Sequence, residues 1–492
     1  MNNVLFRADG NATIATGHVM RCLTIAEAVH ERGGNAFFVC AELTPSLRSK
    51  IQDAGCELCE LSCAPCSQKD AEKTVEEAKR VNAQWIVTDG YGFDGAYQDI
   101  VKSGGSQLMV IDDYGHADHY CADIVFNQNI SADEAFYRNR KSETMLLLGP
   151  KYALIRREFR RCNWTRVIPD HAAHVLATVG GSDPENISTK IMHALASLAI
   201  DKRIIAGGSS PFIDEQKALA TTLNQTEVVV DALGMAEHMA WADIAIGAGG
   251  STTLEMAYMG IPFMTMIFAM NQEKGSQALD HAGVSMHLGW AKDIDGQTLR
   301  DAVQELAENK EKREAMSAAG RALVDGDGVD RVVMHLLGSR IRLRRVHEED
   351  MQMLFKWAND PVIRSSAFST NQITWEDHAA WFAKKLHDPK CTILIAFDTE
   401  DTPIGQIRFD EVAEHTADID VHLAPDQRGK GYGPELIREG VQTLHRSGTH
   451  TFNAYIKEEN AASMQAFTKA GFTDNRLTNV RGNPARHFFR TA

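Results

Sequence analysis

The chain of 492 residues is 44% hydrophobic and 24% charged, and its formal net charge is −15 at pH 7. This is the composition of a folded globular protein, and the acidic balance argues against a general affinity for nucleic acid or for an anionic membrane surface. The length predicts about three domains. The N-terminal stretch MNNVLFRADG has neither the basic start nor the apolar core of a signal peptide. We therefore expect a cytoplasmic protein without membrane contact.

The first predicted unit is a strand, a glycine-containing loop and a helix. The apolar run NVLFRAD precedes the loop, and a second apolar run, NAFFVCAE, follows the helix, which is typical of a βαβ unit. One face of the helix is apolar, at Val19, Leu23, Ala26 and Val29. His18 follows Gly17 where the loop becomes the helix, so we expect it to face the ligand crevice at the carboxyl ends of the strands. A histidine that only caps the helix or fills the sheet edge is the alternative.

A cysteine cluster follows in the stretch CELCELSCAPC, with Cys56, Cys59, Cys63 and Cys66. Two C-x-x-C pairs could bind zinc or an iron–sulfur cluster, but they lie much closer together than the pairs of usual zinc sites. The segment also has the pattern of a strand. We therefore favour buried or reactive thiols and expect no bound metal, with the metal site at residues 56–66 as the alternative.

The rest of the chain predicts an α/β protein of three domains. Helical and apolar segments alternate through about residue 155, as expected for a doubly wound parallel sheet. A second alternating region covers residues 156–338, so the two form Rossmann-like domains in a GT-B-type arrangement, an architecture of many nucleotide-sugar enzymes. Residues 340–492 carry alternating strands that predict an α/β domain with a mixed sheet.

Two glycine loops of the second region have the pattern of a phosphate site. The stretch IGAGGSTTLE places glycines after an apolar strand and puts Ser251 or Thr252 where the next helix needs a cap. Glu255, one turn on, could accept hydrogen bonds from a ribose. The stretch VGGSD places a second glycine loop after the first strand of the region. The candidate nucleotide-binding residues are Gly17, Gly180, Gly181, Ser182, Gly249, Gly250, Ser251, Thr252 and Glu255.

Several of these motifs, in this order, carry a family resemblance. Residues 1–337, through FRADGNATIATGHVMRCLTIA, TDGYG, IDD, VGGSD, GAGGSTTLE, MNQ and VDGDG, resemble the UDP-2,4-diacetamido-2,4,6-trideoxy-β-L-altropyranose hydrolases of pseudaminic acid biosynthesis. The resemblance implies that His18 is the general base, a role suited to an imidazole near neutral pH. It also implies that Arg21, Tyr91 and Asn271 line the sugar site.

The last region carries a second resemblance. Arg428, Gly429, Gly431 and Gly433 form an R-x-x-G-x-G pattern at a helix start, where exposed amides suit a pyrophosphate. With AYIKEENAASMQAFTKAGF and FKWANDPVIR, this resembles the GNAT superfamily of acyl-CoA N-acyltransferases over about residues 340–490. The resemblance implies that this loop, Leu423 and Asn460 bind acetyl-CoA as co-substrate. The site of the family's tyrosine acid is Phe467, and Tyr455 is the nearest candidate to replace it.

One strand of this region could supply a base. Asp418, Asp420 and His422 alternate onto one face of the stretch ADIDVHL, and a solvated strand face is the alternative.

Together the resemblances imply a bifunctional enzyme. The pseudaminic pathway acetylates a 4-amino group on a UDP-sugar immediately before the hydrolase acts, so one chain would perform successive steps on a UDP-aminosugar. Water attacking opposite UDP would invert the anomeric configuration. The alternatives are a glycosyltransferase fused to a protein or other amine acetyltransferase, and a GNAT domain that only senses acetyl-CoA.

Overall fold

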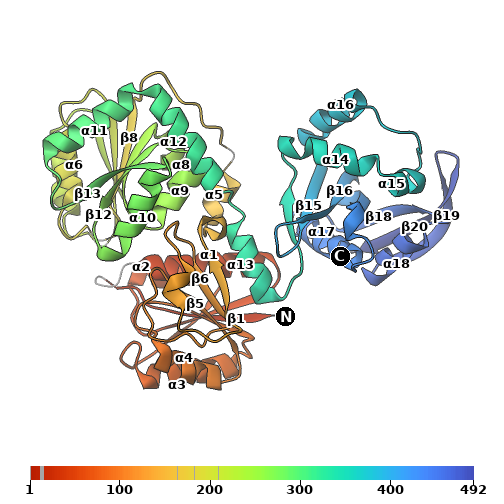
Figure 1. Cartoon of the computed structure of the whole chain (residues 1–492), viewed down its shortest axis with the longest axis horizontal. Helices are drawn as coiled ribbons and strands as arrows, with labels where there is room; N and C mark the ends of the chain where they lie inside the picture. The colour runs from red at the N-terminus through yellow and green to blue at the C-terminus, as the bar shows by residue number, and fades with distance from the viewer. Residues whose placement is uncertain (1, 12–15, 163, 182, 209, 492) are drawn as a thin grey trace. The chain divides into compact units, whose positions relative to one another are not determined.

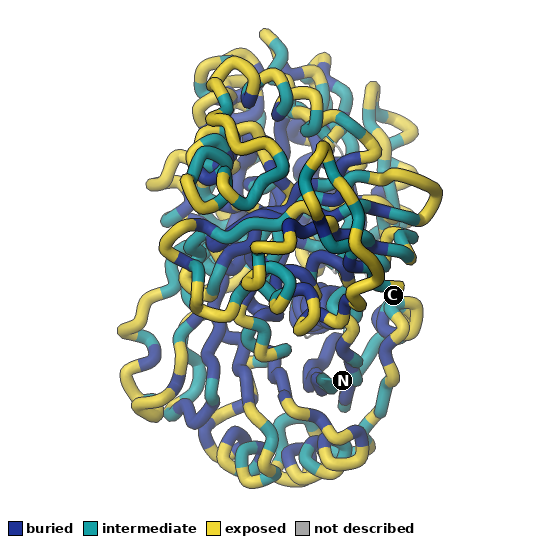
Figure 2. The backbone as a smooth tube through the Cα atoms, turned by 90° about the vertical axis from the view of Figure 1, so that its right-hand side faces the viewer, coloured by how far each residue is buried: buried dark blue, intermediate teal, exposed yellow. Residues whose placement is uncertain are grey.

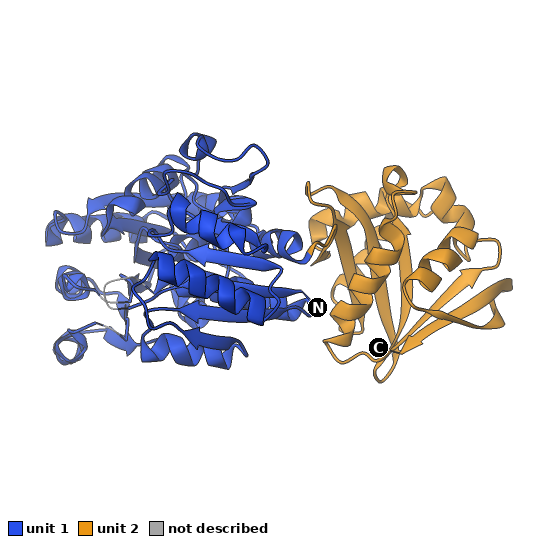
Figure 3. Cartoon of the chain, turned by 90° about the horizontal axis from the view of Figure 1, so that it is seen from below, with its two compact units in different colours: residues 1–337 blue, residues 338–492 orange. Residues whose placement is uncertain are grey.

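The computed structural model describes residues 2–11, 16–162, 164–181, 183–208 and 210–491. The chain forms two compact units, Met1–Leu337 and Gly338–Ala492 (Figure 3). Within each unit the central strands are mostly buried and the turns between elements mostly exposed (Figure 2).

The first sheet of unit 1 is parallel, with the strand order β3-β2-β1-β4-β5-β6-β7. Its strands are β1 (Asn3–Ala8), β2 (Asn35–Cys40), β3 (Glu57–Glu60), β4 (Trp85–Asp89), β5 (Gln107–Ile111), β6 (Ile124–Asn127) and β7 (Met145–Leu148). One face packs against α1 (Gly17–Glu31) and α2 (Pro45–Asp53), and the other against α3 (Gln68–Arg80) and α4 (Gly95–Ser103) (Figure 1). The strand order reverses between β1 and β4, and such a switch point is where open α/β sheets bind ligands.

The second sheet of unit 1 repeats this plan, in the order β10-β9-β8-β11-β12-β13 and again all parallel. Its strands are β8 (His174–Thr178), β9 (Asp201–Ala206), β10 (Thr226–Val230), β11 (Ile244–Ala248), β12 (Phe263–Ile267) and β13 (Ser285–Trp290). The helices that follow its strands or extend its cores are α5 (Arg157–Arg161), α6 (Ile187–Leu195), α7 (Ile213–Ala220), α8 (Met235–Trp241), α9 (Thr252–Tyr258), α10 (Met270–His281), α11 (Gly296–Glu308) and α12 (Lys310–Leu323). Here the switch point lies between β8 and β11.

The last helix of unit 1, α13 (Gly328–Leu337), packs on the first sheet rather than the second. Its apolar face, at Val329, Val332, Val333 and Leu336, joins the core formed by β1 and α1. The chain thus returns to the first sheet at α13. Glycine is needed at position 328 for this close approach, because a Cβ there would lie 2.3 Å from the carbonyl oxygen of Ala153. The boundaries expected from the sequence place this helix in the 156–338 domain and do not anticipate its return.

Unit 2 holds a mixed sheet in the order β14-β15-β16-β17-β18-β20-β19. Its strands are β14 (Arg342–Arg345), β15 (Cys391–Phe397), β16 (Pro403–Ala413), β17 (Thr416–Leu423), β18 (Thr451–Lys457), β19 (Thr473–Val480) and β20 (Asn483–Thr491). Only β17 and β18 pair in parallel, and their pairing stops at Ile419 and Ala454 although both strands continue. The two strands therefore open a gap at their carboxyl ends.

Helices cover both faces of this sheet. One face packs against α17 (Tyr432–His445) and α18 (Ala461–Lys469), and the other against α14 (Met351–Ala358) and α16 (Trp375–Leu386). The short helix α15 (Pro361–Ser366) lies between α14 and α16 in the chain. Two parallel sheets followed by a mixed one confirm the α/β fold class expected from the sequence.

A buried ion pair ties the end of β1 to α3. Arg7, on β1, donates from Nε and Nη2 to the two carboxylate oxygens of Asp70, at 2.8 and 2.6 Å, and neither side chain is exposed. Nη2 also donates to Asp9, at 2.8 Å. Asp9 accepts in turn from the backbone N–H groups of Ala41 and Glu42, which follow β2. This charge network holds Asp9, directly after β1, against the residues that follow β2.

Arg7→Met should lower the free energy of unfolding of unit 1 by about 3–5 kcal/mol, because it leaves two carboxylates buried without their cation. The matched control is Arg48→Met, whose partner is Glu60 and whose side chain is 43% exposed; its cost should stay below about 1 kcal/mol. Urea unfolding followed by circular dichroism measures both. Equal stability of the two variants would contradict a structural role for Arg7.

Candidate active sites

The first site begins with a histidine–aspartate pair. His18 lies in the first turn of α1 and Asp89 ends β4, at the carboxyl edge of the first sheet. His18 Nδ1 is 2.6 Å from Asp89 Oδ1, and the two residues are 7% and 0% exposed. A carboxylate can only accept, so Nδ1 carries the proton and the lone pair of the neutral ring lies on Nε2. Asp89 thus orients an imidazole that can act as a base.

Arg21, one turn further along α1, joins this pair to a second carboxylate. It donates from Nε and Nη2 to Asp89, at 2.9 and 2.7 Å, and from Nη1 to Asp113, at 2.7 Å. Burial by itself lowers the pKa of Arg21, but Asp113 and Asp89 raise it well above its usual range. The guanidinium therefore stays charged between the two carboxylates.

Tyr91 and Asn271 extend the network to the second sheet. The Tyr91 hydroxyl donates to Asp113 Oδ2, at 2.6 Å, and accepts from Asn271 Nδ2, at 2.8 Å. Asn271 lies in the first turn of α10 and is 180 positions away in the sequence. The Tyr91 ring meets the His18 ring edge-on, with 4.9 Å between centroids. Burial and the charge of Asp113 raise the pKa of Tyr91, so its hydroxyl is a neutral donor.

The structure thus brings together His18, Arg21, Tyr91 and Asn271, which the sequence singles out separately. Sequence reasoning missed the carboxylates and the amide that connect them. Asp89, Asp113 and Asn129 each follow the apolar run of β4, β5 or β6, and Asn129 Nδ2 donates to Asp113 Oδ1 at 2.8 Å. A polar residue directly after each of several parallel strands is the signal that would have indicated them.

The loop between β11 and α9 packs closely against α10. A Cβ on Gly249 would lie 2.2 Å from Ser276 Oγ, whereas Gly250 faces open space. Helix α9 begins at Thr252, but Ser251 has helical backbone angles and its side chain forms no capping hydrogen bond, so the expected side-chain cap is not formed. The hydroxyl of Thr253 donates to the carbonyl of Gly250 instead, at 2.7 Å.

Glu255 is paired with a residue that the sequence did not indicate. Arg156 donates from Nε and Nη2 to its two carboxylate oxygens, at 2.5 and 2.9 Å, and Glu255 is 6% exposed. The ribose contact of Glu255 stays a prediction, and it would have to use the remaining lone pairs.

The loop after β8 lies next to the start of α1. Gly180 has a φ of 100°, which favours glycine, and a Cβ on Gly181 would lie 3.5 Å from the hydroxyl of Thr16, next to Gly17. Ser182 lies outside the described residues. The glycines of this loop therefore lie close to the helix that carries His18.

In unit 2 the expected acetyl-CoA loop is a left-handed turn. Gly429 and Gly431 have φ values of 77° and 84°, and Gly431 is the N-cap of α17. A Cβ on Gly433 would lie 3.5 Å from that of Ala466, on α18, and 3.9 Å from a methyl group of Leu423. Arg428 points elsewhere and donates to Asp360 Oδ1, at 2.6 Å. Backbone amides, rather than the guanidinium, are the donors this turn presents.

Asn460 and Phe467 have structural roles. Asn460 is the N-cap of α18, where its side-chain oxygen accepts from Ser463 N at 3.1 Å. Phe467 is 2% exposed and packs against Phe472 and Phe488, so no polar group replaces the tyrosine acid at this position.

Tyr455 directly follows Ala454, the last residue of β18 that pairs with β17, so it lies at the gap between these two strands. It is 38% exposed and stacks on His487, at 5.0 Å between ring centroids. His487 contacts Asn453, and Asn453 donates to Asp418, at 3.0 and 3.2 Å. A chain of polar groups therefore runs from Tyr455 across the sheet to β17.

The face of β17 that carries Asp418 also carries Asp420 and His422. Arg408 donates to Asp420, at 2.9 Å. His422 Nε2 is buried and has no hydrogen-bond partner among the described residues. Burial lowers the pKa of His422 to about 4, so its ring is neutral at physiological pH. Nδ1 of His422 is 3.5 Å from Nε2 of Gln406, so Nε2 is the ring nitrogen without a partner.

The cysteine cluster contains protonated thiols. Burial raises the pKa of Cys56 to about 12 and that of Cys66 to about 11. Among the residues that the structure describes, no group of three or more His, Cys, Asp or Glu side chains is arranged to hold a metal ion. Among those same residues, no helix combines the length and apolar character needed to cross a membrane.

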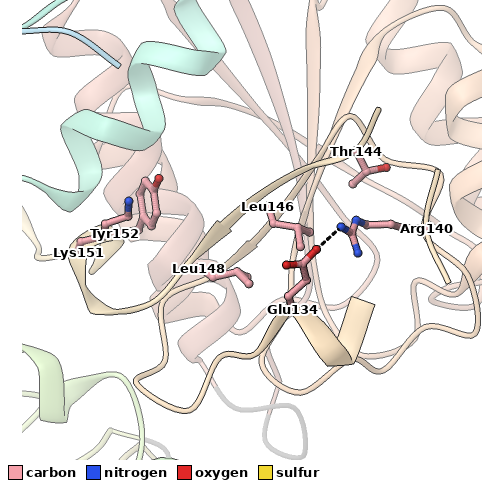
Figure 4. Close-up of a pocket in the computed structure, with 7 residues that line it drawn as sticks. All are labelled: Glu134, Arg140, Thr144, Leu146, Leu148, Lys151 and Tyr152. Carbon is pink, nitrogen blue, oxygen red and sulfur yellow. Dashed lines mark hydrogen bonds and ion pairs between the residues drawn. The ribbon is translucent and has the colours of Figure 1, made fainter. Parts of the chain in front are cut away.

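A cavity of about 390 Å³ lies elsewhere in unit 1, beside β7. Figure 4 shows Arg140 paired with Glu134 at its rim, 2.5 Å apart. None of the predicted site residues lines it.

Two family models match parts of the chain. Residues 175–331 match the glycosyltransferase family 28 C-terminal domain, and residues 340–473 match the acetyltransferase (GNAT) domain. The crystal structure of MurG from Acinetobacter baumannii aligns with a TM-score of 0.50 at 14% identity, over 69% of this chain and all of MurG. That likeness supports the GT-B-type fold of unit 1.

One curated relative matches nearly the whole chain, and another matches little more than half of it. An uncharacterized protein of Methanocaldococcus jannaschii is 22% identical over 94% of this chain and 95% of its own. The UDP-2,4-diacetamido-2,4,6-trideoxy-β-L-altropyranose hydrolase of Campylobacter jejuni is 24% identical over 57% of this chain and 97% of its own. The chain is thus a fusion of a GT-B-like part, similar to this hydrolase and to glycosyltransferase family 28, with a GNAT acetyltransferase domain.

Proposed function

We propose that the chain performs two successive reactions on one nucleotide sugar. The GNAT domain N-acetylates the 4-amino group of a UDP-aminosugar with acetyl-CoA. Unit 1 then hydrolyses the resulting UDP-2,4-diacetamido-2,4,6-trideoxyhexose to UDP and the free sugar, as in pseudaminic acid biosynthesis. The observation that carries the hydrolase assignment is the Asp89–His18 pair, because it orients an imidazole whose ring adjoins Tyr91, and the Tyr91 hydroxyl contacts Asn271.

In the hydrolysis, His18 acts as general base. Its Nε2 removes a proton from water while the water oxygen attacks the anomeric carbon on the face opposite UDP, which inverts the configuration. The bond from the anomeric carbon to the phosphate oxygen breaks, and UDP leaves with the electron pair. Asp89 holds Nδ1–H and stabilises the imidazolium that forms. Arg21, Tyr91 and Asn271 position the sugar.

The two glycine loops of the second sheet hold the diphosphate. The first loop is at Gly180 and Gly181, with Ser182 outside the described residues, and the second is at Gly249, Gly250, Ser251 and Thr252. The N–H of Gly249 already donates to the carbonyl of Met266, at 3.0 Å, so the other backbone N–H groups would donate to phosphate oxygens, and the open space beside Gly250 supports close approach. Gly17 would contribute from the start of α1, where a Cβ on Gly181 would lie 3.5 Å from the hydroxyl of the preceding Thr16. Glu255, held by Arg156, would accept from the ribose with its remaining lone pairs.

In the acetylation, the amine nitrogen attacks the thioester carbon and the carbon–sulfur bond breaks. The turn at Gly429, Gly431 and Gly433 binds the pyrophosphate of acetyl-CoA through its amides, and Leu423 and Asn460 border the gap between β17 and β18 that receives the pantetheine arm. His422 takes the proton of the amine. Tyr455 gives its proton to the departing thiolate of CoA.

One incubation tests the whole proposal. The protein is mixed with the UDP-4-amino-sugar and acetyl-CoA, and UDP, CoA and sugar are followed by NMR. We expect CoA and the acetylated UDP-sugar first, then UDP and free sugar of inverted configuration without any added acceptor. A requirement for an acceptor would indicate a glycosyltransferase. Binding of acetyl-CoA without turnover would indicate a sensor domain.

His18→Asn should lower the hydrolytic kcat by roughly 10²-fold or more, because the general base is lost while the diphosphate contacts remain. Steady-state kinetics on the pre-acetylated substrate measure the loss, and calorimetry should show nearly unchanged binding of UDP. His30→Asn, at the other end of α1, is the control and should retain activity. Hydrolysis near the wild-type rate in His18→Asn would refute the assignment.

Asp89→Asn should also lower kcat, by roughly 10²- to 10⁴-fold, because an amide N–H donating to His18 Nδ1 leaves the proton on Nε2. The chemical shifts of ¹⁵N-labelled His18 should report the changed tautomer. An active Asp89→Asn variant with the Nε2–H tautomer would show that His18 is not the base.

Tyr455→Phe should lower the acetyltransferase kcat by roughly 10²-fold and leave the KM for acetyl-CoA almost unchanged, because it removes a proton donor and not a binding group. Phe467→Tyr, in the core of α18, should not restore the loss. Thiol release measures the rate. The hydrolase should keep its activity on pre-acetylated substrate in both variants; loss of both activities would argue against independent sites.

A further inference from the structure

A second histidine–aspartate pair lies beside the first. Asp112 directly precedes Asp113 after β5, and His116 Nδ1 is 2.8 Å from Asp112 Oδ2. The two side chains are 0% and 3% exposed. Asp112 Oδ1 accepts from the backbone N–H groups of Tyr114 and Gly115, at 2.7 Å each, which fixes the turn between Asp112 and His116. The turn that carries the pair is therefore fixed by hydrogen bonds to Asp112.

The Asp112 contact also determines the tautomer of His116. Burial by itself raises the pKa of Asp112, but His116, Tyr120 and Gly115 hold it below its usual range, so the carboxylate is ionised. The proton of the neutral ring therefore lies on Nδ1, and Nε2 is an acceptor. Both ring nitrogens of His116 are buried, and neither forms a geometrically regular hydrogen bond among the described residues; Nδ1 has its 2.8 Å contact with Asp112, whereas Nε2 has no polar partner. A buried acceptor without a donor is rare in folded proteins and needs an explanation.

The ring of His116 adjoins Tyr91, as the ring of His18 does. The ring of Tyr91 lies 4.9 Å from that of His18 and 5.9 Å from that of His116, both edge-on. Tyr114 lies 5.2 Å from Tyr91 and 6.3 Å from His116. Tyr91 and Tyr114 are 38% and 42% exposed. The ring of His116 thus lies next to two exposed tyrosine rings at the proposed sugar site.

We infer that His116 Nε2 accepts a hydrogen bond from the sugar, from an amide N–H of an N-acylated hexose or from a hydroxyl. The inference rests on the proposed function and assigns His116 a binding role in it. The sugar then contacts both edges of Tyr91, with the reacting carbon near His18 and a donor group near His116. Asp112 is the positioning residue that keeps Nε2 free of a proton.

The test compares binding of UDP with binding of UDP-2,4-diacetamido-2,4,6-trideoxyhexose by calorimetry. His116→Phe keeps a ring but removes the acceptor, so it should bind UDP as the wild type does and the UDP-sugar roughly tenfold or more weakly. Asp112→Asn should have the same effect while keeping the His116 ring, because an amide N–H donating to Nδ1 turns Nε2 into a donor. His119→Phe is the control, since His119 contacts Asn139 instead; its affinities should not change.

Each outcome separates the possibilities. If both variants bind the UDP-sugar with wild-type affinity, or lose UDP and UDP-sugar affinity equally, the inference is wrong. Should His116→Phe fail to fold in a thermal melt, Asp112→Asn decides the question. A wild-type protein that binds the UDP-sugar no more tightly than UDP, and releases no UDP from it, would contradict the proposed function together with this inference.

Discussion

The guanidinium of Arg21 between two buried carboxylates is the interaction on which the proposed hydrolase site depends. Asp89 and Asp113 end neighbouring strands, β4 and β5, and their charges would repel each other without a cation between them. Arg21 supplies it from α1, the same helix that carries His18. The strand ends, the helix and the imidazole are thereby fixed together, and Tyr91 and Asn271 join the network through Asp113. A change in any one charge would alter the position of the others.

Parallel sheet topology explains why these residues meet. In a parallel sheet all carboxyl ends lie at one edge, so the residues that follow β1, β4, β5 and β6 come together although they are far apart in the sequence. The switch point between β1 and β4 leaves room there for α1 to begin. The two halves of unit 1 repeat this plan, and the Tyr91–Asn271 hydrogen bond joins the edges at which their strands have their carboxyl ends. The GNAT domain produces its gap differently, by ending the pairing of β17 and β18 before the strands end.

The sequence predicts the α/β class, the alternation of helices and strands, and the position of His18 where a loop becomes a helix, because apolar periodicity and glycine turns are local signals. Tyr91 and Asn271 are indicated only by the family resemblance. The sequence does not predict the partners that occupy those side chains. Arg156 on Glu255 and Asp360 on Arg428 are long-range ion pairs, and no local pattern encodes them. The same holds for α13, whose apolar stripe specifies a helix without specifying which sheet it covers. The capping role of Ser251 fails for a subtler reason, since a serine caps only with an extended backbone.

The distribution of charge suits the proposed hydrolysis despite the acidic chain. Asp89 and Asp113 outnumber Arg21 at the edge of the first sheet, so the sugar would meet a site with an excess of negative charge. Positive charge develops on the anomeric carbon as a glycosidic bond breaks, and such a site stabilises it. The leaving diphosphate gains negative charge at the same moment, and it would lie against backbone amides of the second half, where carboxylates such as Glu255 are already paired. The two halves of unit 1 would thus stabilise opposite charges across the bond that breaks. Because backbone amides would hold the diphosphate, a chain with a net charge of −15 would need no basic surface to bind it.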